Sequence, residues 1–164
     1  MTSENKYEFT GETKGGLKQI RRISDGVIGG WIQSEYNLSQ YGNAWVYGYA
    51  RVHGNARVYG YAQVYGNAWV HGDVRVYGYA QVYGNAWVHG NAQVHGVGDC
   101  WSVSGLECPI TYTKSDRCLN IGCQRKTLEE WMQYDGNELP PHVIGFVVAL
   151  AKGAGVWLKE DGER

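Results

Sequence analysis

The chain has 164 residues, of which 43% are hydrophobic and 13% aromatic, and its formal net charge is −1. This composition suits one folded domain, and the small net charge excludes general electrostatic attraction to extended nucleic acid or to anionic lipid. The longest apolar stretch, residues 143–151, is too short to cross a bilayer, so we expect no membrane partner.

The N-terminal segment, residues 1–27, is polar and is expected to cap the structure that follows. Its first sixteen residues contain no apolar run, so they do not have the pattern of an export signal. Without export, the four cysteines are expected to be free thiols, and the expected location is the cytoplasm.

The next segment is a repeat in which glycine occupies every sixth position from Gly42 to Gly96. Between the glycines runs the hexad V-x-G-x-A-x, with valine at every position of its column from Val46 to Val94. Residues 59–76 and 77–94 differ at three positions, so the full repeat is eighteen residues, or three hexads. A fixed short period indicates a solenoid, and a coil of three short strands and three turns predicts a triangular β-helix.

Each predicted strand is the piece A-x-V-x, in which alternation places alanine and valine inward. Glycine then turns the corner, because it adopts dihedral angles that other residues avoid. The inward phase continues outside the repeat at five residues: Ile28, Ile32, Leu38, Cys100 and Ile110. Residues 28–100 therefore predict an all-β solenoid of about four to five coils, about 20–24 Å high at the spacing of neighbouring strands.

Outward residues of successive coils are expected to stack in columns about 4.8 Å apart. The first face combines tryptophan and histidine columns: Trp69, Trp87, His53, His71 and His89. Aromatic walls of this extent favour subunit contact, although stacking on sugar rings and simple cross-strand ladders are alternatives. Zinc is a weaker alternative, because parallel histidines do not converge as tetrahedral ligands, and no metal is assigned.

The second face carries no charged residue within the repeat and is expected to expose Trp45 beside a column of tyrosines. The third face is the candidate for a phosphate-bearing ligand, because guanidinium groups bind phosphates and aromatic rings stack on bases. It combines arginines, tyrosines and an adjoining polar corner: Arg57, Arg75, Tyr59, Tyr77, Asn55, Asp73 and Asn91. Simple solvation of the two arginines is the alternative interpretation.

Residues 101–164 are expected to form a C-terminal cap and oligomerisation region of short strands and two short helices. Strands are predicted within residues 101–123, and the capping box Thr127-Leu128-Glu129-Glu130 opens the first helix. After Pro140 and Pro141, a second apolar helix is expected over about residues 142–152. Cys118 and Cys123 are candidate ligands or reactive thiols, whereas Cys100 has the inward phase of a small apolar residue.

The pattern V-x-G-N-A-x-V resembles the hexapeptide-repeat, left-handed β-helix superfamily. The flanking segments Ile28-Gly29-Gly30-Trp31-Ile32 and Leu128-Glu129-Glu130-Trp131 are similar to small hexapeptide-repeat proteins of phages and prophages. The resemblance implies a left-handed coil, a homo-oligomer with a trimer favoured, and the cytoplasm of a bacterial host.

The resemblance also raises a CoA-dependent acyltransferase as an alternative, with His89 or His95 as general base. Such enzymes typically place the histidine near an extruded loop, and residues 41–99 contain none. The favoured hypothesis is a non-enzymatic phage-type binding or assembly protein, without catalytic residues or cofactor, that oligomerises through aromatic faces. Its expected target is a host nucleotide-type signal or a host defence protein. A structural virion component or spacer is the third alternative.

Overall fold

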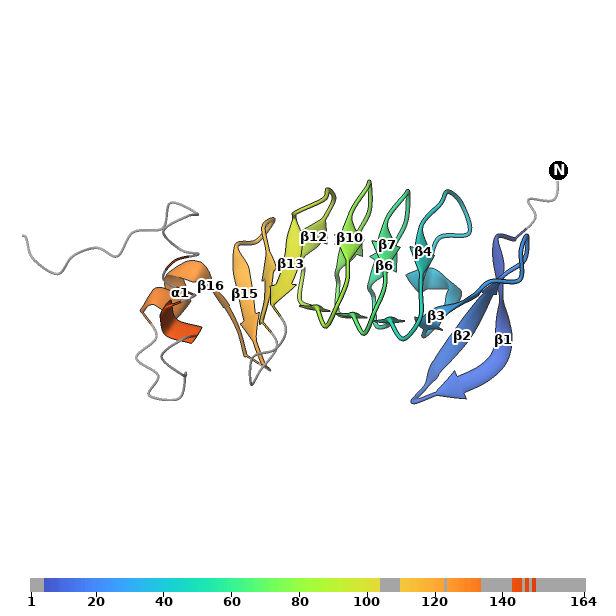
Figure 1. The fold of residues 1–164 in the computed structure, drawn as a ribbon, viewed down its shortest axis with the longest axis horizontal. Coiled ribbons are helices and arrows are strands. Elements are labelled where there is room, and N and C mark those ends of the chain that lie inside the picture. Colours follow the sequence, from blue (N-terminus) through green and yellow to red (C-terminus); the bar gives the residue numbers. More distant parts are fainter. Residues whose placement is uncertain are drawn as a thin grey trace, which may run out of the picture.

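The computed structural model describes residues 5–103, 110–122, 124–133, 143–145, 147 and 149. Its centre is a β-solenoid of about four turns, with an antiparallel hairpin at the N-terminal end and an antiparallel sheet at the C-terminal end (Figure 1). The predicted solenoid is therefore confirmed, and the strands stack along the long axis of the molecule.

Nine two-residue strands form the coils: β4 (Trp45–Val46), β5 (Arg51–Val52), β6 (Arg57–Val58), β7 (Gln63–Val64), β8 (Trp69–Val70), β9 (Arg75–Val76), β10 (Gln81–Val82), β11 (Trp87–Val88) and β12 (Gln93–Val94). They pair in parallel in three columns, namely β4-β7-β10, β5-β8-β11 and β6-β9-β12. Partners lie eighteen residues apart, as Trp69 opposite Trp87 shows, so the predicted repeat length is confirmed.

The core consists of the inward valines and alanines, which are 0–1% exposed throughout the repeat. Glycine turns the corners in the left-handed region; Gly72, for example, has φ +79°. A Cβ atom there would lie 3.0 Å from the carbonyl oxygen of Gly90, so successive corners are too close for a side chain. Within each hexad, alanine and valine therefore fill the dry interior, and glycine allows the tight corner.

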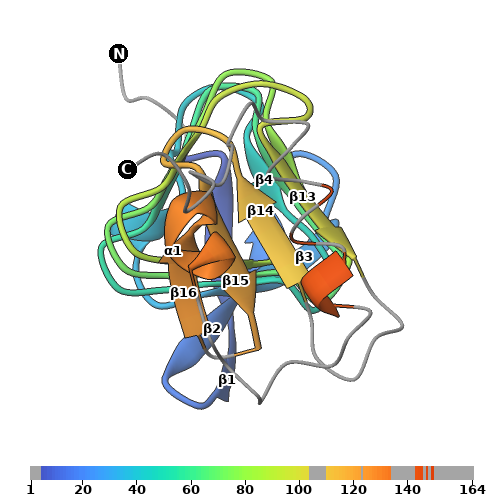
Figure 2. The ribbon, with the colours of Figure 1, turned by 90° about the vertical axis from the view of Figure 1, so that its left-hand side faces the viewer.

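The N-terminal cap contains β1 (Tyr7–Lys14), β2 (Leu17–Arg22), β3 (Ile28–Ile32) and the short 3₁₀ helix η1 (Glu35–Asn37). β1 and β2 form a hairpin, β2 pairs antiparallel with β3, and β3 joins the solenoid by pairing in parallel with β5. Gly15 and Gly16 form the two-residue turn between β1 and β2. Both have positive φ, as a type I′ hairpin turn requires. The hairpin projects beyond the outline of the coils (Figures 1 and 2).

One predicted orientation and one predicted exposure at this end are wrong. Ile28 was expected inside but is 51% exposed, because β3 begins as the edge of the hairpin sheet before the coil starts. Trp45 has the expected outward phase, since it pairs with the outward Gln63, but it is covered and only 1% exposed. Tyr7 packs edge-on against the Trp45 ring and Arg22 lies over it, so the hairpin covers this part of the second face.

The C-terminal cap is an antiparallel sheet of β13 (Cys100–Val103), β14 (Ile110–Thr113), β15 (Cys118–Ile121) and β16 (Gln124–Thr127). Helix α1 (Leu128–Met132) follows, and its predicted capping box is present between Thr127 and Glu130. The sheet lies across the end of the coils (Figure 2). The Thr111 hydroxyl accepts from the Trp87 backbone N–H at 2.8 Å, and the Asn120 amide donates to the Trp87 carbonyl at 2.7 Å. Side chains therefore replace the hydrogen bonds that a further coil would supply.

The expected second helix is described at residues 143–145, 147 and 149, which are helical. Val143 and Val147 are buried, so one side of this helix packs inward. None of the helices in the described residues has the length and apolar character that crossing a bilayer requires.

Candidate functional site

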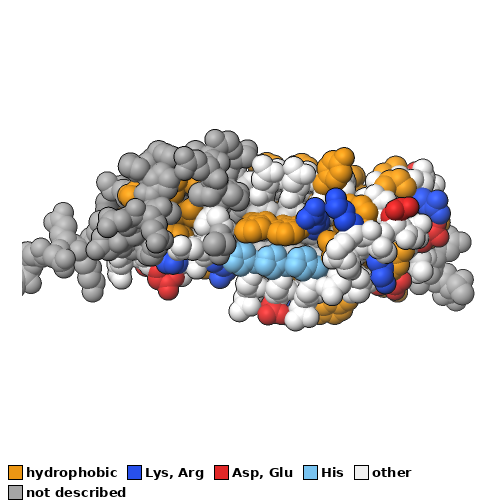
Figure 3. All heavy atoms as spheres, turned by 90° about the horizontal axis from the view of Figure 1, so that it is seen from below, with side chains coloured by type: hydrophobic (Ala, Val, Ile, Leu, Met, Phe, Trp, Pro, Cys, Tyr) orange, Lys and Arg blue, Asp and Glu red, His pale blue; other side chains and the backbone are white. Residues whose placement is uncertain are grey.

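The first face carries the tryptophan column (Trp69 and Trp87) and the histidine column (His53, His71 and His89). Figure 3 shows the two columns side by side along the solenoid, with basic side chains at one end. The centroids of neighbouring histidine rings are 5.0 and 5.2 Å apart, with planes inclined by 5° and 8°. The tryptophan rings are 5.2 Å apart at 8°. The register of the coils therefore brings these residues together as the sequence predicts.

This stacking determines which parts of the rings a ligand can reach. The rings of each column are stacked in parallel. Their faces are therefore covered by neighbouring rings, and only their edges face solvent. The Arg51 guanidinium covers the outer face of Trp69 at 5.2 Å, as a cation–π contact. A flat ligand can therefore stack only where a column ends.

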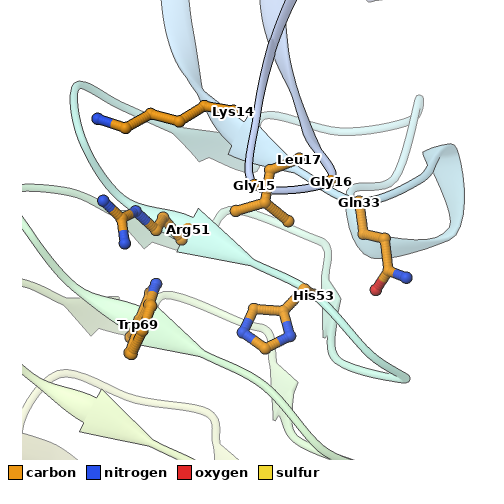
Figure 4. A pocket seen from close by; sticks show the side chains of 8 residues that line it. All are labelled: Lys14, Gly15, Gly16, Leu17, Gln33, Arg51, His53 and Trp69. Atoms are coloured by element: carbon orange, nitrogen blue, oxygen red, sulfur yellow. The ribbon is translucent and has the colours of Figure 1, made fainter.

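The histidine column ends in a cleft of about 510 Å³ between the first face and the hairpin turn. Lys14, Gly15, Gly16, Leu17, Gln33, Arg51, His53 and Trp69 line it. Gln33, on the rung above His53, turns its side chain away and accepts a hydrogen bond from the Gly54 backbone N–H at 2.8 Å (Figure 4). The space above the His53 ring is left to the cleft, with Leu17 as its apolar wall.

Charge in and around this cleft is positive at its rim and neutral along the histidines. Burial and the Arg51 guanidinium lower the pKa of His53. Burial and the two neighbouring imidazoles lower the pKa of His71. Burial and Arg125 lower the pKa of His89, with Asp116 acting in the opposite direction. At neutral pH the histidine column is therefore uncharged, and Arg51 and Lys14 supply the positive charge.

A smaller cleft of about 290 Å³ adjoins the first and shares Arg51 and Trp69 with it. Tyr49, Asn67 and Trp87 complete its lining. Tyr49 is 72% exposed, so its ring forms a free aromatic wall at the corner of the coil. The two clefts together give the first face an apolar and aromatic surface with one guanidinium at its centre.

The third face brings together the other predicted ligand-binding residues as a separate surface. The rings of Tyr59 and Tyr77 stack at 5.2 Å, and the Asn55 amide donates to the Asp73 carboxylate at 3.0 Å. The Arg57 guanidinium lies 4.9 Å from the ring of Tyr36. Arg75 and Asn91 are exposed. The predicted columns are present, but Arg57 and Asn55 already have partners within this face.

The interpretation from sequence missed the hairpin side of the cleft, Lys14 and Leu17, and also Gln33, which follows β3. The signal for it was present in the stretch Lys14-Gly15-Gly16-Leu17, because Gly-Gly between two extended segments is typical of a type I′ hairpin. The polar composition of residues 5–22 obscured this pattern.

Among the described residues, the thiols and acidic groups form no metal-binding group on these faces. Cys100 and Cys118 are buried free thiols, and Cys123 lies outside the described residues. Within the described part of the chain, no group of three or more His, Cys, Asp or Glu side chains could hold a metal ion. No carboxylate among these residues forms an ion pair with a histidine.

Comparison with known proteins supports the architecture alone. A family model described as the YdcK beta-solenoid repeat matches residues 62–78 and 80–96. No curated protein and no solved structure matches the chain. The chain is thus a β-solenoid repeat protein, and its function must be argued from the geometry of its surface.

Proposed function

We propose that this protein is a non-enzymatic binding protein that holds a planar, anionic ligand of the nucleotide type. The site is the cleft between the hairpin turn and the first face. One observation carries the proposal: the open end of the histidine column, at His53, lies in the same cleft as Arg51 and Lys14. The cleft therefore offers a ring face and two cations together.

A flat ring on His53 would form the next rung of a column whose rings are 5.0–5.2 Å apart. Stacking of a base on an aromatic side chain contributes about 1–3 kcal/mol by alanine substitution. The neutral imidazole does not repel the ring, and Arg51 offers its guanidinium to a phosphate. Leu17 excludes water from one side, which strengthens that charged hydrogen bond.

The proposal keeps the biological setting that the repeat and its flanks suggest. A hexapeptide-repeat protein of phage type that binds a nucleotide stoichiometrically would sequester a host signal. Self-association through the exposed tyrosines of the solenoid would bring several clefts into one assembly. Tyr41, Tyr49, Tyr61 and Tyr79 are each more than half exposed and are the candidates for such contacts.

Nucleotide titration tests the proposal. Adenine, guanine and uracil nucleotides are added while tryptophan fluorescence and thermal stability are followed, since Trp69 lines the cleft. We expect saturable binding that Arg51→Gln weakens about tenfold, the value of one charged hydrogen bond. Arg57→Gln, on the third face, is the matched control and should leave the affinity unchanged. Equal affinity in Arg51→Gln, or no binding of any nucleotide, would overturn the proposal.

Acyl transfer from CoA is the second candidate, favoured by one observation. His53 is the histidine that lines the cleft, and its lowered pKa keeps it in the neutral form that a general base needs. This candidate predicts retention of CoA and acetyl transfer that His53→Gln abolishes. Binding of CoA without acetyl transfer would be consistent with the binding function and would refute the acyltransferase candidate.

A further inference from the structure

A second large cleft, of about 440 Å³, lies at the base of the hairpin, away from its turn. Here the start of β1 and the end of β2 meet the second face and a corner of the first coil. Lys6, Arg22, Ser24, Gly42, Asn43, Ala44, Trp45, Tyr47 and Gln63 line it. It shares no residue with the cleft assigned to the proposed function.

Two cations converge in this cleft. The Lys6 ammonium donates to the Ala44 carbonyl oxygen at 2.8 Å, and the Arg22 guanidinium lies 4.5 Å from the centre of the Trp45 ring. Arg22 is partly neutralised by Asp25 at 3.0 Å, but that carboxylate is 44% exposed. Among the residues that the structure describes, no carboxylate forms an ion pair with Lys6. Within the part of the chain that the structure describes, half of the positive charge in the cleft is therefore without a counter-ion.

This arrangement makes the charged form of Lys6 less favourable. Burial and the nearby Arg22 lower the pKa of its ammonium from the ordinary value of 10.5 to about 8. A group held in this way gains stability from any anion that enters beside it, because the anion offsets both the desolvation and the repulsion.

The cleft also holds hydrogen-bond donors that lack acceptors. An ammonium has three N–H groups and a guanidinium five, of which Ala44 and Asp25 engage one each. The Trp45 ring also lines the cleft, but its indole N–H is fully buried and does not count among the donors that a ligand in the cleft can reach. Ser24 and Asn43, at the exposed rim, add a hydroxyl and an amide.

We propose that this second cleft binds a phosphate group, as inorganic phosphate or as a phosphate monoester. A phosphate monoester carries a charge of about −1.5 to −2 near neutral pH and three strong acceptor oxygens. It therefore matches two cations and several free donors better than a carboxylate, whose single charge and two oxygens one guanidinium already satisfies.

The test uses the whole chain and inorganic phosphate as the probe, at constant ionic strength against sodium chloride. The indole N–H signal of Trp45 in a proton–nitrogen spectrum reports the cleft. We expect a saturable shift with phosphate and none with chloride. Lys6→Gln and Arg22→Gln should each weaken binding about tenfold, whereas Lys18→Gln and Arg21→Gln on the same hairpin should not. The control cations are occupied elsewhere, Lys18 over Phe9 and Arg21 on Glu8.

Further arms make each outcome decisive. Asn43→Asp places a negative charge at the exposed rim without touching the core, so it should abolish phosphate binding even if Lys6→Gln destabilises the hairpin. Glycerol phosphate in place of phosphate distinguishes a monoester from the free ion. Acetate binding as tightly as phosphate, or a non-saturating shift, would overturn the proposal. Arg51→Gln, in the first cleft, should leave this phosphate affinity unchanged, so this site and the proposed function succeed or fail separately.

Discussion

Replacing Thr111 by valine tests how the C-terminal sheet closes the solenoid. Thr111 is fully buried, and its hydroxyl accepts the Trp87 backbone N–H at 2.8 Å. Within the coils that N–H position is bonded to the carbonyl of the next rung, as the Trp69 N–H is to Ala86 at 2.8 Å. Thr111→Val keeps the shape of the side chain and removes only the acceptor.

The magnitude follows from that single bond. Leaving a partly buried N–H without an acceptor costs about 1–3 kcal/mol, and the methyl that replaces the hydroxyl returns about 0.8 kcal/mol of apolar burial. The expected net loss of about 1–2 kcal/mol lowers the melting temperature by about 2–8 °C for a chain of this length.

The assay combines thermal unfolding by circular dichroism with amide hydrogen exchange. Because each coil of a solenoid leans on its neighbours, the loss of protection should concentrate at β11, with the Trp87 amide affected most and β5 least. Thr111→Ser is the control, since it keeps the hydroxyl and should preserve the protection of Trp87. An unchanged melting temperature with unchanged Trp87 protection in Thr111→Val would refute this account of the cap.

Three further predictions follow from burial and charge. The histidine column has folded pKa values below the ordinary 6.5, so the unfolded chain binds more protons and stability should fall as pH drops below about 6.5. His71→Gln should flatten this decline in urea unfolding at pH 7.5 and 5, and an unchanged pH dependence in this variant would refute it. Burial, with smaller contributions from Asp116 and Asp99, raises the pKa of the Cys100 thiol to about 12. Iodoacetamide at pH 8 should therefore label Cys100 only after denaturation, as peptide mass spectrometry will show, and rapid labelling of the folded chain would contradict this. Val70→Ala, at a fully buried site, should cost about 2 kcal/mol of unfolding free energy, and a loss below half that value would mean that the coil collapses into the gap.

The solenoid could be predicted because its determinants are local and repeated. Glycine at every sixth position requires a corner, and alternation of alanine and valine with outward residues requires a dry interior on one side. Once the repeat was known to be eighteen residues, the neighbours of His71 and Trp69 were determined by counting. The stacked columns of the first face are thus a consequence of sequence alone, and the structure confirms them.

The two clefts could not be predicted in the same way, because each depends on where a non-repeating segment folds back. The hairpin carries Lys14 and Leu17 to the first face and Lys6 and Arg22 to the second. Its contacts span more than thirty positions, as the bond from the Lys6 backbone N–H to Gln40 illustrates. No local pattern encodes such a distance, and for this reason Trp45 was expected to be exposed although the hairpin covers it.

The repeat itself limits where binding can occur. In the histidine and tryptophan columns of the coils the rings stack on identical rings, so the regular surface offers edges of nearly uniform character, with little to distinguish one ligand from another. Both large clefts arise where the repeat meets the hairpin, because there the ring faces and cations differ from rung to rung. Gln33 is an example. With a histidine at this position, the histidine column would continue by one rung and would no longer end at His53. Specific recognition in this fold therefore depends on the residues that break the pattern, and substitutions at Gln33, Leu17 or Arg22 should change ligand choice more than changes within the hexads.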